Sequence, residues 1–371
     1  MAKLRAKKTV RGIAIGLGSS LAAAVTSLGV LYYTRFRTIA SIKKLTDHRD
    51  YNLYRMNVKY HYDIDKIIKR GIVDDQTLID AIVVESMPYL PVHIQAPNFA
   101  CSAFCATDTA GEVLMGRNYD FKNDTSAMLV YCTPEKGYKS VAMGALDNIC
   151  ANSPDSGLNQ KITCLTAPFL CLDGMNEKGV SIAVLTLDSE PTYQKTGRPV
   201  IGTALAIRLI LDRAATTEEA VKLFESYDMF ASSGRDYHFY VTDASGDSRI
   251  IEYDCAGSDR KLVATPVRTA TNFFEIHKDH VLPNQKNGIY GHGRERYDKI
   301  EGILTANEGS VTKDIAWEAL KAAAQDPNPE DVTSNTQWSV VYDDTNLTAQ
   351  IAVRRNWGEV YDYSLRDNVI S

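Results

Sequence analysis

The sequence predicts an α+β fold in which antiparallel sheets are covered by helices on their outer faces. Strand-like and helix-like segments come in blocks rather than in strict alternation, which favours antiparallel sheets. Hydrophobic residues make up 44% and charged residues 23% of the 371 residues, a composition that allows a sizeable core. Two strand-like runs, 238–242 and 248–253, surround a five-residue turn and indicate a hairpin.

Residues 1–33 are predicted to form a basic cytoplasmic tail followed by a transmembrane or signal segment. Five Lys and Arg residues and no acid lie in residues 1–11, and residues 12–33 carry no charge over 22 positions. About 20 residues span a bilayer as a helix, so we expect membrane contact through residues 12–33. An uncleaved signal anchor would leave the rest of the chain extracytoplasmic, and a cleaved signal peptide would make it secreted. A buried soluble helix is the remaining alternative.

Residues 34–100 are predicted to be a stalk or a pro-segment. Two short helical patterns occur near residues 37–44 and 77–87. Pro88, Pro91 and Pro97 then favour an extended path, because the residue before a proline is pushed away from helical conformation. That path leads directly into residue 101.

Residues 101–371 are predicted to form the main domain. Its first two strands are separated by a turn at Asp108–Gly111, and a buried strand follows the turn at Asp173–Gly179. The helices expected, the second of them with Thr217 as its cap, are residues 202–214, 217–227, 295–304 and 313–324. The strands expected are residues 102–107, 113–117, 180–187, 238–242, 248–253, 338–342, 348–353 and 360–363.

Several classes of function are disfavoured by the sequence. The net charge is −5 and no basic stripe is present, so we expect no nucleic-acid partner. His277 and His280, with Glu275 nearby, lack a third metal ligand and are interpreted as a solvated loop, so no metal site is predicted. The glycine-rich run 288–293 follows no convincing strand, which disfavours a phosphate loop, and the GxSxG motif of serine hydrolases does not occur.

The seven cysteines do not form CxxC pairs, which argues against a zinc site. Three disulfides and one free thiol would fit an exported protein, but their connectivity stays open.

Cys101 and the second strand of its hairpin carry the residues that suggest chemistry. The hairpin returns Arg117, 16 positions later, toward the start of the first strand. A cation beside a thiol favours the reactive thiolate, and Asp120 can hold an ammonium or orient a proton donor. Each residue alone has an ordinary reading as a core cysteine or a surface ion pair. Cys105 is a second candidate nucleophile on the same strand face.

These residues, together with a second motif, resemble the choloylglycine hydrolase group, which includes bile salt hydrolases and penicillin V acylases. The wider relatives are the acid ceramidase-like amidases and the penicillin acyltransferases. Cys101 with Gly116-Arg117-Asn118-x-Asp120 and the run Asp173–Gly179 carry the resemblance. Weaker matches, over a similarity that covers about residues 101–363, are His238–Asp243, Gly246, Ile250–Glu252, Thr271-Asn272 and Arg296-Tyr297.

The resemblance implies a four-layer αββα sandwich of two antiparallel sheets and an N-terminal-nucleophile hydrolase. Cys101 would attack an amide carbonyl, and its freed α-amine, which titrates at about 7.7–8.0, would act as general base. Arg117 would stabilise the thiolate, and Asp120 would hydrogen-bond the α-amine. Asn272 would donate to the oxyanion, and Arg296 would close the polar network, with Arg294 as the alternative. No cofactor is implied.

The expected activity is cleavage of a linear, non-peptide C–N bond in a small-molecule N-acyl amide. Thr186 stands where the bile salt hydrolases have an oxyanion-site asparagine, so a bile salt is not the expected substrate. Because Cys101 is internal, the mechanism predicts cleavage between Ala100 and Cys101. An acyltransferase and an inactive membrane-tethered binding module of the same fold stay open as alternatives, as does a homo-oligomer.

Overall fold

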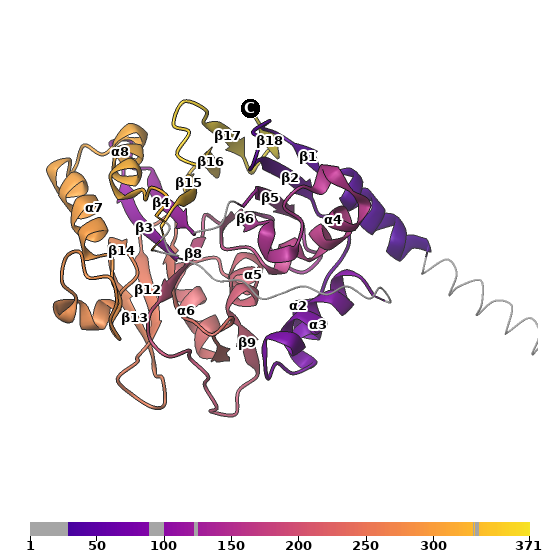
Figure 1. Cartoon of the computed structure of the whole chain (residues 1–371), viewed down its shortest axis with the longest axis horizontal. Coiled ribbons are helices and arrows are strands. Elements are labelled where there is room, and N and C mark those ends of the chain that lie inside the picture. Colours follow the sequence, from indigo (N-terminus) through magenta and orange to yellow (C-terminus); the bar gives the residue numbers. More distant parts are fainter. Residues whose placement is uncertain (1–28, 89–99, 122–124, 329, 331–333) are drawn as a thin grey trace, which may run out of the picture.

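The computed structural model describes residues 29–88, 100–121, 125–328, 330 and 334–371. Its two large sheets face each other, and helices cover their outer faces (Figure 1). The larger sheet has the spatial order β1 (Lys43–Lys44), β2 (Leu53–Asn57), β5 (Ala127–Cys132), β6 (Ser140–Ala145), β7 (Asp173–Asn176), β8 (Ser181–Leu187), β11 (Asp236–Thr242), β12 (Ser248–Tyr253) and β13 (Leu262–Pro266). The other has the order β14 (Thr269–Ala270), β3 (Ala100–Thr107), β4 (Val113–Asp120), β15 (Thr336–Asp343), β16 (Thr348–Val353), β17 (Tyr361–Ser364) and β18 (Val369–Ile370).

Helices α5 (Thr203–Arg213) and α6 (Thr217–Glu225) pack on the larger sheet, and α7 (Arg294–Ala306) and α8 (Lys313–Ala323) pack on the other. Further helical segments are residues 29–40, α2 (Ile64–Lys69), α3 (Asp75–Ser86) and α4 (Leu158–Thr163), with 3-10 turns η1 (Asp147–Ile149), η2 (Pro154–Ser156), η3 (Cys164–Phe169) and η4 (Glu275–His280). A small parallel pair joins β9 (Val200–Gly202) to β10 (Asp228–Phe230). Across the interior, β3 packs against β8, and this contact brings the two sheets together at the first strand of the predicted hairpin.

The helix starts follow local capping chemistry. The side chain of Thr216 accepts a hydrogen bond from the backbone N–H of Glu219, so α6 is capped one residue before the predicted Thr217. The side chain of Thr312 caps α8 in the same way. In α8 the buried residues recur at helical spacing, which places one face of the helix on the sheet.

Alternation along β3 decides which side chains face the interior between the sheets. Cys101, Ala103 and Cys105 belong to the large apolar cluster between the sheets, whereas Phe104 and Ala106 belong to the cluster under α7 and α8. Successive side chains of a strand point to opposite faces, so this split follows from the period of two. The thiol of Cys101 therefore lies on the sheet-to-sheet side of β3.

The predicted fold class is wrong in its N-terminal element. None of the helices among the described residues has both the length and the apolar character that a membrane span requires. Residues 1–28, which hold the predicted basic tail and most of the predicted transmembrane or signal segment 12–33, lie outside the described residues. The described helical residues 29–40 include Arg35, which is buried and donates hydrogen bonds to the carbonyl oxygens of Glu85 (2.7 Å) and Ser86 (2.5 Å) at the end of α3. That helix is thus held by polar contacts to the folded domain.

The sheets are also not purely antiparallel, because β2 pairs in parallel with β5. Its residues Leu53, Tyr54 and Met56 are almost completely buried in the main core. The segment 34–100, expected as a stalk or pro-segment, thus contributes β1, β2, α2 and α3 to the packed molecule in its described part (Figure 1). Its release as a pro-segment stays a prediction.

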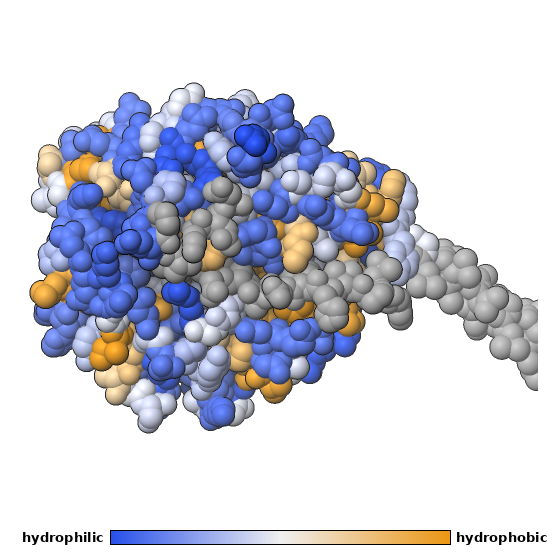
Figure 2. Space-filling model, in the orientation of Figure 1, coloured by the Kyte–Doolittle hydropathy of each residue, from blue (hydrophilic) through white to orange (hydrophobic). Residues whose placement is uncertain are grey.

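All seven cysteines are free thiols, and five of them are buried. The three disulfides that would fit an exported protein are therefore not formed. On the face shown in Figure 2, hydrophilic residues predominate and hydrophobic ones form small scattered patches. Such scattered apolar residues are ordinary for a folded protein surface.

Candidate active site

Cys101 lies at the second position of β3, and its side chain has no exposed surface. Its backbone N–H donates a hydrogen bond to Asn272 Oδ1 at 3.3 Å. Its carbonyl oxygen accepts one from Arg296 Nη1 at 2.9 Å. Both backbone groups of the predicted nucleophile are therefore held by residues that sequence analysis placed in the site.

The side chain of Asn272 forms hydrogen bonds with Cys101, Arg296 and Thr186. Its Oδ1 also accepts a hydrogen bond from Arg296 Nη2 at 2.7 Å, and its Nδ2 donates to the carbonyl oxygen of Thr186 at 2.8 Å. The side-chain amide is thus oriented at both ends, by α7 on one side and by β8 on the other. Thr186 contributes its backbone carbonyl here, which fixes the amide donor that the predicted oxyanion role requires.

Two glycines explain how residues 272 and 296 come so close. Gly291 has φ +103°, and a Cβ atom there would lie 2.1 Å from the carbonyl oxygen of Asn272. Gly293 has φ +87°, and a Cβ atom there would lie 2.3 Å from Arg296 Nη2. Only glycine fits both the left-handed conformation and the space. The glycine-rich run 288–293 therefore serves backbone packing beside the site.

Between these glycines, His292 is 8% exposed, and its backbone N–H donates to the carbonyl oxygen of Asn272 at 2.8 Å. Its ring nitrogen Nδ1 lies 2.7 Å from Asp188 Oδ2. Sequence reasoning did not identify this pair, which connects the Asn272 segment to the residues that follow β8.

Arg117 is completely buried on β4 and points into the space between the sheets. Its Nη2 donates to the carbonyl oxygen of Val184 at 2.9 Å, and its Nε lies 3.3 Å from Asp173 Oδ2. Burial raises the pKa of the Cys101 thiol to about 12, and Arg117 is the group that most opposes this rise. Arg117 therefore acts on the thiol in the predicted sense, but the thiol of the uncleaved chain stays protonated at neutral pH.

Asp173 is a site residue whose role sequence reasoning missed, although it opens the second motif. It also accepts hydrogen bonds from Trp338 Nε1 (3.1 Å) and Tyr342 Oη (2.5 Å) on β15. Burial raises the pKa of the Asp173 carboxyl, and Arg117 opposes that rise. A buried charge needs a partner and hydrogen bonds, and Asp173 supplies both to Arg117.

Asp120 lies at the end of β4 and has no exposed surface. Its carboxylate accepts hydrogen bonds from Thr336 Oγ1 (2.6 Å) and Gln325 Nε2 (2.8 Å), and it lies 3.8 Å from Arg296 Nη1. Burial raises its pKa, and Arg296 is the main opposing cause. In the uncleaved chain, therefore, the Cys101 nitrogen is bound by Asn272, and Asp120 is held beside Arg296.

The structure separates the two arginine candidates on α7. Arg296 is 4% exposed and reaches Cys101, whereas Arg294 forms a surface ion pair with Asp298 at 2.8 Å. The structure thus brings together Cys101, Arg117, Asp120, Asn272 and Arg296, with Thr186 beside them, and places Arg294 outside the cluster. Cys105 shares the strand face but lies beside Ser248 and the acids Asp243, Asp247 and Asp344 instead of Arg117.

Comparison with known proteins identifies the family of this chain. Residues 107–357, more than half of the chain, match the family model described as "Acyl-coenzyme A:6-aminopenicillanic acid acyl-transferase". The match begins six residues after Cys101 and contains the other predicted site residues. A penicillin V acylase of Pectobacterium atrosepticum is 27% identical over 172 residues, which are 43% of this chain and 45% of that protein. The chain therefore spans less than half the length of this curated relative.

Two solved structures share the fold. A mutant of the conjugated bile acid hydrolase from Clostridium perfringens has a TM-score of 0.54 at 15% identity, over 73% of this chain and 95% of that one. The penicillin V acylase from Agrobacterium tumefaciens has a TM-score of 0.52 at 20% identity, over 72% of this chain and 86% of that one. At these identities the likeness concerns the fold.

Proposed function

We propose, from the premise that this chain belongs to the acyl-coenzyme A:6-aminopenicillanic acid acyl-transferase family, that it is a cysteine N-terminal-nucleophile amidohydrolase. The predicted resemblance to the choloylglycine hydrolase group is confirmed by the family match and by the penicillin V acylase relative. The proposed reaction is hydrolysis of a linear, non-peptide C–N bond in a small-molecule N-acyl amide. Cys101 is the proposed nucleophile.

One observation carries the proposal: both backbone groups of Cys101 are bound by the pair Asn272 and Arg296. An ordinary core cysteine in a strand needs no such partners, because its backbone bonds to neighbouring strands. Here the backbone N–H of Cys101 donates to the side-chain amide of Asn272, which in turn accepts a hydrogen bond from the guanidinium of Arg296. That nitrogen is the atom that would become the general base.

The uncleaved chain is the inactive precursor in this mechanism. The nitrogen of Cys101 is an amide and cannot accept a proton, and burial keeps the pKa of its thiol at about 12. Activation begins when Sγ attacks the carbonyl carbon of Ala100. The C–N bond to Cys101 breaks and a thioester forms between Ala100 and Sγ. The Cys101 nitrogen takes up the proton that the thiol loses and becomes the free α-amine. Water then hydrolyses the thioester and frees both the thiol and the α-amine of Cys101.

In the cleaved enzyme the α-amine takes the thiol proton as Sγ attacks the substrate carbonyl. Arg117 stabilises the thiolate, since it is the main group that lowers the pKa of this thiol. Asn272 Nδ2 carries a second N–H besides the one bonded to the Thr186 carbonyl, and this second N–H is the proposed donor to the oxyanion that develops on the substrate carbonyl. The amine product leaves with the proton, and water hydrolyses the acyl-thioester to regenerate Cys101.

The decisive test is the mature N-terminus together with activity on chromogenic N-acyl substrates. Mass spectrometry of the purified protein should find a fragment that begins at Cys101, and Cys101→Ala should leave the chain intact and inactive. Cys105→Ser is the matched control, since Cys105 shares the strand and its interior face, and it should be processed and active. Full activity from a chain that stays intact would overturn the proposal.

A second candidate activity, acyl transfer, is favoured by the description of the matching family. The same thioester would then pass its acyl group to an amine instead of water. Product analysis with a nucleophilic amine added to the assay distinguishes the two. An acyltransferase should consume the amine preferentially at millimolar concentration, whereas a hydrolase should release mainly the free acid.

A further inference from the structure

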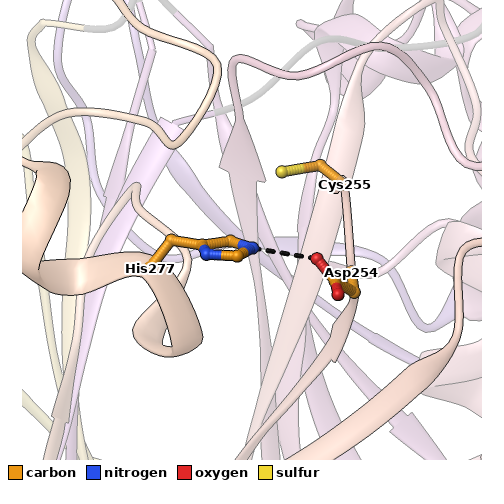
Figure 3. Close-up of side chains that lie close together, drawn as sticks. All are labelled: Asp254, Cys255 and His277. Carbon is orange, nitrogen blue, oxygen red and sulfur yellow. Dashed lines mark hydrogen bonds and ion pairs between the residues drawn. The ribbon is translucent and has the colours of Figure 1, made fainter. Parts of the chain in front are cut away.

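A second cluster of reactive side chains lies at the end of β12, outside the site described above. Figure 3 shows Asp254, Cys255 and His277 pointing toward one another. Their ligand atoms, a carboxylate oxygen, a thiol sulfur and an imidazole nitrogen, all lie within 4.8 Å of one another. His277 Nε2 and Asp254 Oδ1 are 2.9 Å apart. All three residues are partly exposed, so an ion in solution can reach them.

The atoms of this cluster are close to the arrangement that a tetrahedral zinc ion requires. Zinc binds sulfur at about 2.3 Å and nitrogen or oxygen at about 2.0–2.2 Å, so its ligands are separated by about 3.3–3.7 Å. The 2.9 Å between His277 Nε2 and Asp254 Oδ1 is slightly too small, and the 4.8 Å within which all three atoms lie is about 1 Å above this range. To bind one ion, the three side chains would have to rotate so that their ligand atoms reach these separations.

The surroundings hold the three ligands in place. Asp254 accepts a hydrogen bond from the backbone N–H of Ala256 at 2.9 Å, which orients its carboxylate. The ring of His277 packs on Tyr290, with centroids 4.5 Å apart, and this contact limits the rotation of the imidazole. The thiol of Cys255 is within 3.7 Å of the carbonyl oxygen of Ile289. Ligands that are oriented by such partners lose less entropy when they bind a metal.

We propose that Asp254, Cys255 and His277 form a zinc site with a fourth position for water. The mixed N, S and O donor set suits zinc, a borderline-soft ion, better than magnesium or calcium, which prefer oxygen ligands alone. On binding, the S–H bond of Cys255 breaks, its proton goes to solvent and an S–Zn bond forms. The thiolate and the carboxylate together then balance the two positive charges of the ion.

The neighbouring charges are compatible with this ion. Arg260, whose positive charge acts on Cys255, donates to Asp236 and Thr192 and is thus held by other acceptors. Lys278 forms an ion pair with Glu275 at 2.6 Å. The pairing of His277 with His280 and Glu275 considered from the sequence is therefore replaced by Asp254 and Cys255, which directly follow β12 and lie 23 and 22 positions before His277.

The proposed ion would join η4 to the end of β12. Because η4 begins three residues after Asn272, the ion would anchor the segment that carries this site residue. The buried carboxylate of Glu252 already accepts the backbone N–H groups of Glu275 (2.8 Å) and Ile276 (3.2 Å) at the start of η4. A zinc ion bound by Asp254, two residues after Glu252, would attach η4 to the end of β12 a second time. This second attachment would raise the melting temperature of the full chain.

The test measures zinc on the full-length protein. Chelator-treated protein is dialysed against a micromolar excess of zinc, washed, and analysed for metal content. The expected result is one zinc per chain. Loss of a residue that only supports a ligand typically lowers metal affinity about 10–100-fold, so loss of the ligand itself in Cys255→Ser should lower zinc affinity by more than about 100-fold. Cys150→Ser, which changes a free exposed cysteine elsewhere, is the matched control and should keep the ion.

Two further measurements keep the proposal falsifiable if a variant fails to fold. Cobalt in place of zinc should give a thiolate-to-metal charge-transfer band in the near ultraviolet. Zinc should protect Cys255 from iodoacetamide in the unaltered protein and leave the alkylation rate of Cys150 unchanged. The proposal is overturned if the protein retains no zinc, if zinc binding is insensitive to Cys255→Ser, or if the cobalt protein lacks the thiolate band.

Discussion

The guanidinium of Arg296 and the backbone of Cys101 are joined by a hydrogen bond of 2.9 Å from Nη1 to the Cys101 carbonyl oxygen. The other end of the same guanidinium donates to Asn272 Oδ1, which accepts the Cys101 N–H. One side chain from α7 thus controls the positions of both the carbonyl and the nitrogen of the proposed nucleophile.

Arg296→Lys should strongly reduce both processing and hydrolysis. Lysine keeps the positive charge but cannot make the two diverging hydrogen bonds of a guanidinium. We expect kcat/KM to fall by about 10²–10³-fold, the range seen when an oriented donor is removed from an active site. Arg294→Lys alters a solvent-exposed ion pair with Asp298, two positions away, and should behave as the unchanged protein. Equal losses in the two variants would contradict the assignment.

Gly291→Ala should displace Asn272. A Cβ atom at position 291 would lie 2.1 Å from the Asn272 carbonyl oxygen, so the backbone has to move. A misplacement of about 1 Å at a reacting group can cost about 10²-fold in rate. Gly309→Ala is the control, because φ is +73° there and nothing lies within 4 Å of the added atom. Alanine is strained by the positive φ at both positions, but only at position 291 does its Cβ atom collide with the site. Gly291→Ala alone should therefore lose activity when both variants are assayed at the same concentration of folded protein.

The reactivity of Cys101 should depend on whether the chain is cleaved. With a pKa of about 12, only about one thiol in ten thousand is ionised at pH 8, and the side chain is buried. Iodoacetamide should therefore leave Cys101 unmodified in intact chains and modify it in chains that begin at Cys101. Peptide mapping by mass spectrometry measures both populations in one sample, with the exposed Cys150 as reference. Rapid alkylation of Cys101 in intact chains would argue against a latent precursor.

Stability should fall between about pH 4 and pH 7 because of Asp344. Burial raises the pKa of this carboxyl from 3.8 to about 7, and the hydroxyl groups of Ser181 and Thr242 donate to it. Over this interval the unfolded state releases a proton that the folded state keeps, so rising pH favours unfolding. A difference of about three pH units corresponds to about 4 kcal/mol at most.

Asp344→Asn isolates this contribution, since other buried carboxyls titrate in the same direction. Urea unfolding at pH 5 and pH 8 should show a smaller pH dependence for the variant than for the unchanged protein. The difference should appear as greater stability of the variant at pH 8, where Asp344 is ionised. An identical pH dependence in the two proteins would refute the role assigned to this carboxyl.

Local signals in the sequence predicted the hairpin of the site well. Alternation and the turn at Asp108–Gly111 indicated the two strands that the structure forms as β3 and β4, extended to Ala100 and Asp120. They could not decide between Arg294 and Arg296, because residues two apart on a helix point to different sides and the inward side is set by packing. The pairing of Arg117 with Asp173 was also beyond prediction, since it joins two sheets over 56 positions.

In the N-terminal part of the chain the local sequence pattern predicted the structure poorly. An uncharged run of 22 residues predicted a membrane or signal helix, whereas the described residues contain no helix suited to cross a membrane. The parallel pairing of β2 with β5 had no sequence signal either, because it joins strands more than 70 positions apart and depends on which edge of the sheet is open. The apolar residues of β2 indicated that this strand is buried, but not which strand it pairs with.

The parallel pairing of β2 with β5 restricts how the protein could be produced in active form. A gene shortened to begin at Cys101 would make a protein whose β5 edge lacks its neighbour and whose interior lacks the side chains of Leu53, Tyr54 and Met56. Such a shortcut would yield an incomplete fold, unless residues 29–88 were supplied as a separate polypeptide to complete it.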